Sequence, residues 1–119
     1  MSGAPSRVLV VDDAKSGRDM LTRRLEQDGH RADVAEDGDQ ALTMLGAVDY
    51  DLVLLDILMP RLDGFAVLER MKADERLRHV PVIVISALEE TVSVVRCLQM
   101  GADDYVTKPF DAVILRARV

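Results

Sequence analysis

Three uninterrupted runs of four apolar residues limit most strongly how this chain can fold. The runs are Val8–Val11, Leu52–Leu55 and Val82–Ile85. Strands that are apolar at every position are covered on both faces, which is typical of parallel sheets enclosed between two layers of helices. Two further segments, Arg31–Ala35 and Asp104–Val106, mix apolar and polar residues, and this character suits strands at the edges of the same sheet.

The segments between these strands have the spacing of helices. The strands begin near residues 8, 32, 52, 82 and 104, so each is followed by enough chain for a helix. We expect helices at Lys15–Asp28 (ending before Gly29), after the capping residue Asp37, after Pro60, at Glu89–Met100 and from Asp111 onward. Apolar residues repeat at helical spacing within them, as in Gly17, Leu21 and Leu25; Phe65, Leu68 and Met71; and Val92, Val95 and Leu98. The pattern predicts an α/β fold of the (βα)5 type, a doubly wound five-stranded parallel sheet with the flavodoxin-like order 2-1-3-4-5.

The length of the chain limits the number of domains, and its apolar runs are too short for a membrane span. With 119 residues the chain fits one domain. We expect a flexible lead-in at residues 1–6 and the domain at residues 7–119, whose last helix looks truncated, as in a piece of a longer protein. No apolar run approaches the ~18 residues that a membrane span needs, and the N-terminus lacks the features of a signal peptide.

The number of cysteines indicates the redox compartment of the protein, and its net charge indicates whether it binds nucleic acid. The single cysteine, Cys97, cannot form an internal disulfide, which favours a reducing compartment. The formal net charge of −6 argues against direct binding to nucleic acid. We therefore expect a cytoplasmic protein with no membrane attachment and no direct nucleic-acid partner.

Polar residues follow the predicted strands at the points where the strands end. They are Asp12 and Asp13 after the first strand, Asp56 after the third, Ser86 after the fourth, and Thr107 and Lys108 after the fifth. Taken singly, some have a purely structural explanation, because Asp12 or Asp13 can cap a helix and Ser86 with Glu89 matches a capping box. Since the carboxyl ends of parallel strands share one edge of the sheet, however, three acids, a hydroxyl and an ammonium would meet there.

Three clustered carboxylates need a counter-charge. Two carboxylates about 4 Å apart repel by ~4 kcal/mol at an effective dielectric constant of about 20, and three such pairs would approach ~12 kcal/mol, comparable to the stability of a whole domain. One lysine cannot offset this repulsion and remain free for other work. Oxygen ligands at an open, hydrated site favour Mg²⁺, so we expect a magnesium cofactor at Asp12, Asp13 and Asp56.

The same residues belong to segments whose order and spacing resemble the receiver domains of two-component response regulators. The segments are Asp12-Asp13, Leu52 to Pro60, Ser86-Ala87 and Gly101 to Phe110, and the resemblance extends from about Arg7 to Val119. It implies a phosphorylation-controlled signalling switch that is not a metabolic enzyme. By this resemblance, Asp56 accepts the phosphoryl group from the phosphohistidine of a sensor histidine kinase or phosphotransfer protein.

The resemblance also implies roles for the neighbouring residues. Asp13, Asp56 and the backbone carbonyl of Leu58 would ligate Mg²⁺, with Asp12 acting mostly through a bound water. Ser86 and Lys108 would contact the phosphoryl oxygens, and Ser86 and Tyr105 would move as the switch. The surface of the fourth helix, fifth strand and fifth helix would then control an output domain of the parent chain or a partner, and could form a homodimer.

Three other functions share parts of this pattern. A phosphatase of the haloacid dehalogenase type also uses an aspartyl nucleophile with Mg²⁺, but needs a second acid two residues later, where this chain has Leu58. A flavin- or nucleotide-binding module needs a Gly-, Ser- or Thr-rich phosphate loop after the first strand, where Asp12 and Asp13 would repel phosphate unless a metal intervened. A degenerate receiver used only for interaction is disfavoured by the intact acids, Ser86 and Lys108.

Overall fold

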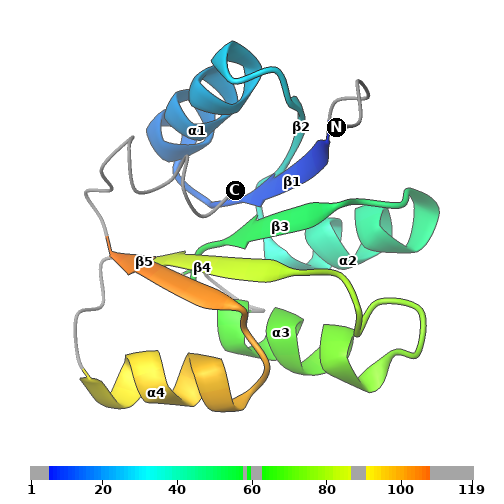
Figure 1. Ribbon diagram of the computed structural model, residues 1–119, viewed down its shortest axis with the longest axis vertical. Helices are drawn as coiled ribbons and strands as arrows, with labels where there is room; N and C mark the ends of the chain where they lie inside the picture. The colour runs from blue at the N-terminus through cyan, green and yellow to red at the C-terminus, as the bar shows by residue number, and fades with distance from the viewer. Residues whose placement is uncertain (1–5, 58, 60–62, 87–90, 108–119) are drawn as a thin grey trace.

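The computed structural model describes residues 6–57, 59, 63–86 and 91–107, with only the backbone described at Ser86, Thr91–Ser93 and Thr107. Strands and helices alternate along this part of the chain (Figure 1). In chain order the elements are β1 (Arg7–Val11), α1 (Lys15–Gln27), β2 (Arg31–Ala35), α2 (Gly38–Ala47), β3 (Leu52–Leu55), α3 (Gly64–Ala73), β4 (Val82–Ser86), α4 (Thr91–Gln99) and β5 (Asp104–Thr107).

The strands form one parallel sheet in the order β2-β1-β3-β4-β5, which confirms the predicted topology. The mixed segments β2 and β5 lie at its two edges. The register places Val11 beside Ala35 on one side and Leu55 on the other. The carboxyl ends of β1 and β3 are therefore level, and whatever follows Val11 and Leu55 comes together at one edge of the sheet.

Successive residues of the central strands point into two different core layers. On one face, Leu21 and Leu25 of α1 pack with strand residues that include Val10 and Leu54. On the other face, α2, α3 and α4 cover strand residues such as Leu55 (Figure 1). All residues of the three apolar runs are buried, because each run meets helices on both sides, as its lack of alternation predicted.

The capping of α2 agrees with the prediction from the sequence, and the capping of α1 differs from it. The Asp37 side chain caps α2 as predicted, accepting a hydrogen bond of 2.7 Å from the Gln40 N–H. The suggestion that Asp12 or Asp13 caps the first helix is wrong, because the N-cap of α1 is Ala14, which has no side-chain cap bond. Ser86 ends β4, and the capping box suggested for Ser86 with Glu89 is not tested, because residues 87–90 lie outside the described part of the chain.

Two residues of the predicted apolar stripe on α4, Val95 and Leu98, face away from the sheet. Val95 and Leu98 are 43% and 46% exposed, whereas Cys97 is fully buried against the core. The Arg96 guanidinium lies 3.9 Å from the ring centre of Phe65 on α3, a cation–π contact that joins the two helices. Cys97 therefore packs in the core, and Val95 and Leu98 form an apolar strip on the outer side of the helix.

Glycines with positive φ, Gly29 (89°) and Gly101 (107°), follow α1 and α4, as the predicted helix ends require. The expected helix from Asp111 and the first five residues of the expected lead-in (residues 1–6) lie outside the described residues. Within the described part of the chain, no helix is long and apolar enough to span a membrane.

Candidate functional site

Three aspartates meet where β1 and β3 end. Asp12 and Asp13 follow β1 and Asp56 follows β3, and one carboxylate oxygen from each lies within 4.8 Å of the other two. Asp12 and Asp56 are only 1% and 6% exposed, while Asp13 is exposed. The structure therefore brings together the three acids that the sequence placed at one edge of the sheet.

The backbone of each buried acid is anchored to a neighbouring strand. The Asp56 N–H donates to the Val11 carbonyl at 2.9 Å, and the Asp12 N–H donates to the Ala35 carbonyl at 3.2 Å. These bonds continue the sheet ladder one residue past the strands. Asp56 is thus positioned by the rigid centre of the sheet rather than by a free loop.

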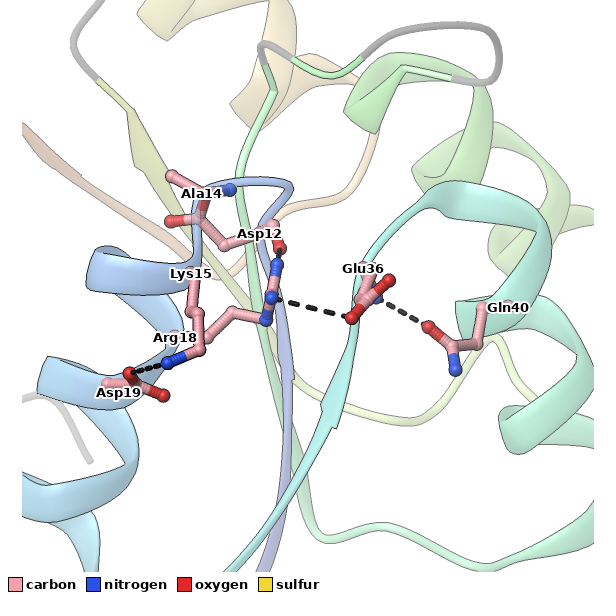
Figure 2. Close-up of polar contacts among 7 residues, drawn as sticks. All are labelled: Asp12, Ala14, Lys15, Arg18, Asp19, Glu36 and Gln40. Atoms are coloured by element: carbon pink, nitrogen blue, oxygen red, sulfur yellow. Dashed lines mark hydrogen bonds and ion pairs between the residues drawn. The ribbon is translucent and has the colours of Figure 1, made fainter.

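Asp12 is contacted by Ala14, by Arg18 and by Gly17, and the first two of these are drawn in Figure 2. Its Oδ1 accepts a 2.9 Å hydrogen bond from the Ala14 N–H, and its backbone carbonyl accepts a 2.9 Å bond from Nη1 of the buried Arg18. Gly17 packs directly against the carboxylate, because a Cβ added at this position would lie only 2.5 Å from Asp12 Oδ2.

Arg18 links this turn to the segment that follows β2. Its Nη2 lies 3.5 Å from Oε1 of Glu36, and the Glu36 N–H donates to Gln40 Oε1 at 2.6 Å (Figure 2). The Arg18 side chain is 11% exposed and the Glu36 side chain 67%. A buried guanidinium therefore bridges the backbone of Asp12 to a solvated carboxylate.

The α3 helix closes the cluster from the other side. A Cβ at Gly64 would collide with the Asp56 carbonyl oxygen and lie 2.6 Å from the Ile57 Cα. The Gly64 N–H donates to the Ile57 carbonyl at 3.1 Å. Only a residue without a side chain allows α3 to begin this close to the backbone that carries Asp56.

The donor set fits a hard divalent cation. Mg²⁺ takes carboxylate oxygens as ligands, and each of the three acids offers one such oxygen within 4.8 Å of the other two. Three carboxylates of which two are buried repel each other strongly, and a cation with oxygen preference removes that repulsion.

The other predicted site residues are only partly described. Ser86 ends β4, next to β3, and its backbone is paired with that of Thr107 on β5. Tyr105 lies opposite Val84 in the sheet, is half-buried and packs against the core layer that contains Leu55. Lys108 and Leu58 lie outside the described residues. The topology thus places the ends of β4 and β5 at the sheet edge where the acids lie.

Sequence analysis did not identify Gly17, Arg18 or Gly64 as part of the site. Helical spacing places Gly17 in an apolar stripe with Leu21 and Leu25, but in the structure Gly17 faces Asp12. One available indication was that Arg18 precedes Leu21 and Leu25 at helical spacing, so a charge interrupts the buried side of α1. The role of Gly64 depends on how closely α3 approaches the strand, and residue spacing does not report that distance.

A parallel sheet of order 2-1-3-4-5 with a triad of aspartates at the ends of its first and third strands is the arrangement of a response regulator receiver. The family model of the response regulator receiver domain matches residues 8–119. The chain therefore belongs to the receiver domains of response regulators.

Individual relatives agree with this assignment. The chain is 40% identical over 114 residues to response regulator PleD of Caulobacter vibrioides, covering 96% of this chain and 25% of PleD. It is 45% identical over 113 residues to the DNA-binding response regulator MtrA of Mycolicibacterium smegmatis, covering 95% of this chain and 48% of MtrA. The chain thus spans between a quarter and about half of the length of these curated relatives.

Solved structures show the same fold. The receiver domain of Francisella response regulator 1452 superposes with a TM-score of 0.89 at 36% identity, covering 95% of this chain and 92% of that one. A structure described as a putative response regulator from Chloroflexus aurantiacus gives a TM-score of 0.93 at 27% identity, covering 97% and 94%.

Proposed function

We propose that this receiver domain is a phosphorylation-controlled switch that accepts a phosphoryl group on Asp56 in the presence of Mg²⁺. The observation that carries the proposal is the triad of Asp12, Asp13 and Asp56, whose carboxylate oxygens lie within 4.8 Å of one another at the ends of β1 and β3. Such a cluster is costly to a fold unless it serves to hold a cation.

Asp56 is the nucleophile in this mechanism. One of its carboxylate oxygens forms a bond to phosphorus while the phosphorus–nitrogen bond of a phosphohistidine breaks, and the imidazole nitrogen keeps the electron pair. Phosphoryl transfer asks the protein mainly for alignment and for neutralisation of charge on the phosphoryl oxygens. The backbone bond to Val11 supplies alignment, and Asp12 and Asp13 hold the cation. When bound, Mg²⁺ supplies the positive charge that lets an anionic phosphoryl group approach three carboxylates.

Residues at the ends of β4 and β5 complete the proposed site. Ser86 and Lys108 contact the phosphoryl oxygens, and the Leu58 carbonyl is a further Mg²⁺ ligand. The resemblance to the family supports these roles, and so does the pairing of Ser86 with Thr107, the residue before Lys108. Tyr105 and Ser86 transmit phosphorylation as a change in packing, since Tyr105 is half-buried beside the core.

The proposed partners are a sensor histidine kinase or a phosphotransfer protein and an output domain. The names of the relatives support an output function, since MtrA is named as a DNA-binding response regulator. The exposed Val95 and Leu98 on α4 support a partner surface formed by α4, β5 and the chain that follows, which a second copy of the domain could also occupy. In the same proposal the domain is cytoplasmic, makes no nucleic-acid contact of its own, and is a signalling module that catalyses its own phosphotransfer.

Phosphorylation by a small phosphodonor tests the proposal. The protein is incubated with acetyl phosphate and Mg²⁺, and its intact mass is measured. Wild type should gain one phosphoryl group, and chelation of Mg²⁺ should prevent the gain. Asp56→Asn should gain none, whereas Asp49→Asn, which removes an exposed carboxylate from the connection before β3, should behave as wild type. Equal labelling of wild type and Asp56→Asn would refute the proposal.

A further inference from the structure

The carboxylate of Asp12 occupies the space that a side chain at position 17 would need. A Cβ built on Gly17 would lie 2.5 Å from Asp12 Oδ2 and 3.2 Å from its Cγ, whereas ordinary contacts of a Cβ begin at 3.4 Å. Gly17 lies in the first turn of α1, where any other residue would have a better helix propensity than glycine, proline excepted. The helix therefore has a glycine at the position that faces an almost fully buried acid.

Asp12 cannot turn away from position 17 without loss. Its Oδ1 is bound to the Ala14 N–H at 2.9 Å, so rotation of the carboxylate breaks that bond (Figure 2). Its backbone is held as well, because the Arg18 guanidinium donates to the Asp12 carbonyl at 2.9 Å in a buried environment. A buried acceptor that loses a charged donor is destabilised.

Arg18 makes this restraint with a planar fork. One nitrogen reaches the Asp12 carbonyl and the other lies 3.5 Å from Glu36. A lysine at this position would keep the positive charge but has a single ammonium on a flexible stem, so it cannot reproduce the two-sided geometry. The substitution Arg18→Lys therefore removes the two-sided contact while it keeps the positive charge.

We propose that Gly17 and Arg18 are positioning residues for the magnesium site. Neither is a ligand; they place the Asp12 carboxylate and backbone so that Asp12 faces Asp13 and Asp56 before the ion binds. The inference rests on the proposed function, because it concerns the affinity of the same acids for Mg²⁺. Residues that orient metal ligands typically change metal affinity by 10- to 100-fold when replaced.

Isothermal titration of Mg²⁺ into the whole chain tests the inference at Gly17. Gly17→Ala should raise the Kd for Mg²⁺ by roughly tenfold. The matched control is Gly46→Ala, the same substitution in α2 at a position with no atom within 4 Å of the added Cβ; its Kd should equal that of wild type. Melting temperatures in chelator, measured in parallel, report whether each variant is folded.

A second pair of variants tests Arg18 by the same titration. Arg18→Lys should weaken Mg²⁺ binding several-fold although the charge is retained. Arg23→Lys, at an exposed position of the same helix, should leave Kd unchanged. A merely structural role for Arg18 would lower the melting temperature in chelator and leave Kd unchanged.

The outcomes separate this inference from the proposed function. If wild type binds Mg²⁺ and both Gly17→Ala and Arg18→Lys bind it with the wild-type Kd, the positioning role is refuted and the proposed function stands. If wild type itself shows no Mg²⁺ binding at millimolar concentration, the proposed function fails and the positioning role fails with it. Weaker binding by Gly17→Ala and Arg18→Lys, but not by their controls, supports the inference.

Discussion

The surroundings of Tyr50 shift the pKa of its phenol well away from the ordinary value. Burial of its ring raises the pKa of the phenol to about 12, and a 2.8 Å hydrogen bond from its hydroxyl to Asp33, together with the charge of that carboxylate, acts in the same direction. Arg7, which lies 3.2 Å from Asp33 and 5.8 Å from the centre of the Tyr50 ring, partly opposes the shift. This group joins strands β1 and β2 to the connection that precedes β3.

The raised pKa predicts a loss of stability at high pH. Because the folded value exceeds the ordinary value of 10.0, folding favours the protonated phenol, and this contribution is complete below pH 10 and is lost as the pH rises toward 12. The free energy of unfolding of wild type should therefore fall across this window. Tyr50→Phe should show a smaller fall, measured by urea unfolding at a series of pH values, and parallel curves for the two proteins would contradict the prediction.

At the scale of elements, the glycine at the start of α3 controls how closely that helix approaches Asp56. Gly64→Ala adds a Cβ that meets the backbone of Asp56 and Ile57, and backbone atoms cannot give way as a side chain can. The substitution should reduce stability by about 1–3 kcal/mol. Gly46→Ala, with open space around the new Cβ, should instead stabilise the protein by about 0.5–1 kcal/mol.

Urea unfolding of the two alanine variants measures both effects. Gly64→Ala should also phosphorylate more slowly, because the carbonyl it displaces belongs to Asp56. A Gly64→Ala variant as stable as Gly46→Ala would show that α3 can move away at no cost. That result would contradict the tight packing of α3 against the end of β3.

The elements differ in how well the sequence predicts them. The three apolar runs identify β1, β3 and β4 because full burial on both faces leaves no room for polar residues. The alternation of strands and helices predicts the doubly wound strand order. The outward direction of Val95 and Leu98 could not be predicted, because a single apolar stripe does not say whether it faces the sheet or a partner. The sequence does not predict the contacts of Gly17 and Arg18 with Asp12 for a related reason, since these contacts depend on where α1 lies relative to Asp12.

For the whole molecule, the acid cluster links stability to magnesium. Without a cation the three carboxylates repel each other, and a ligand that binds only the folded state stabilises it by about 1.4 kcal/mol at ten times Kd. Millimolar Mg²⁺ should therefore raise the melting temperature of wild type. Asp13→Asn should melt a few degrees higher than wild type in chelator, because one repelling charge is gone, and it should gain less from Mg²⁺ and lose phosphorylation.

The control for this prediction is Asp49→Asn, which changes the net charge equally but lies outside the cluster. It should respond to Mg²⁺ as wild type does. If Asp13→Asn melted below wild type in chelator, the acids would be stabilising each other through bonds rather than repelling each other. The electrostatic reason for a magnesium site would then be lost.

The most direct test of the central claim is to locate the phosphoryl group on the chain. After treatment with acetyl phosphate and Mg²⁺, reduction with borohydride converts an acyl phosphate to an alcohol and leaves a permanent mark on the residue that carried it. Peptide mass spectrometry should find this mark at Asp56, only in samples that contained Mg²⁺. A mark at Asp12 or Asp13, or equal marking at Asp56 in chelator, would contradict the assignment of Asp56 as the magnesium-dependent phosphoacceptor.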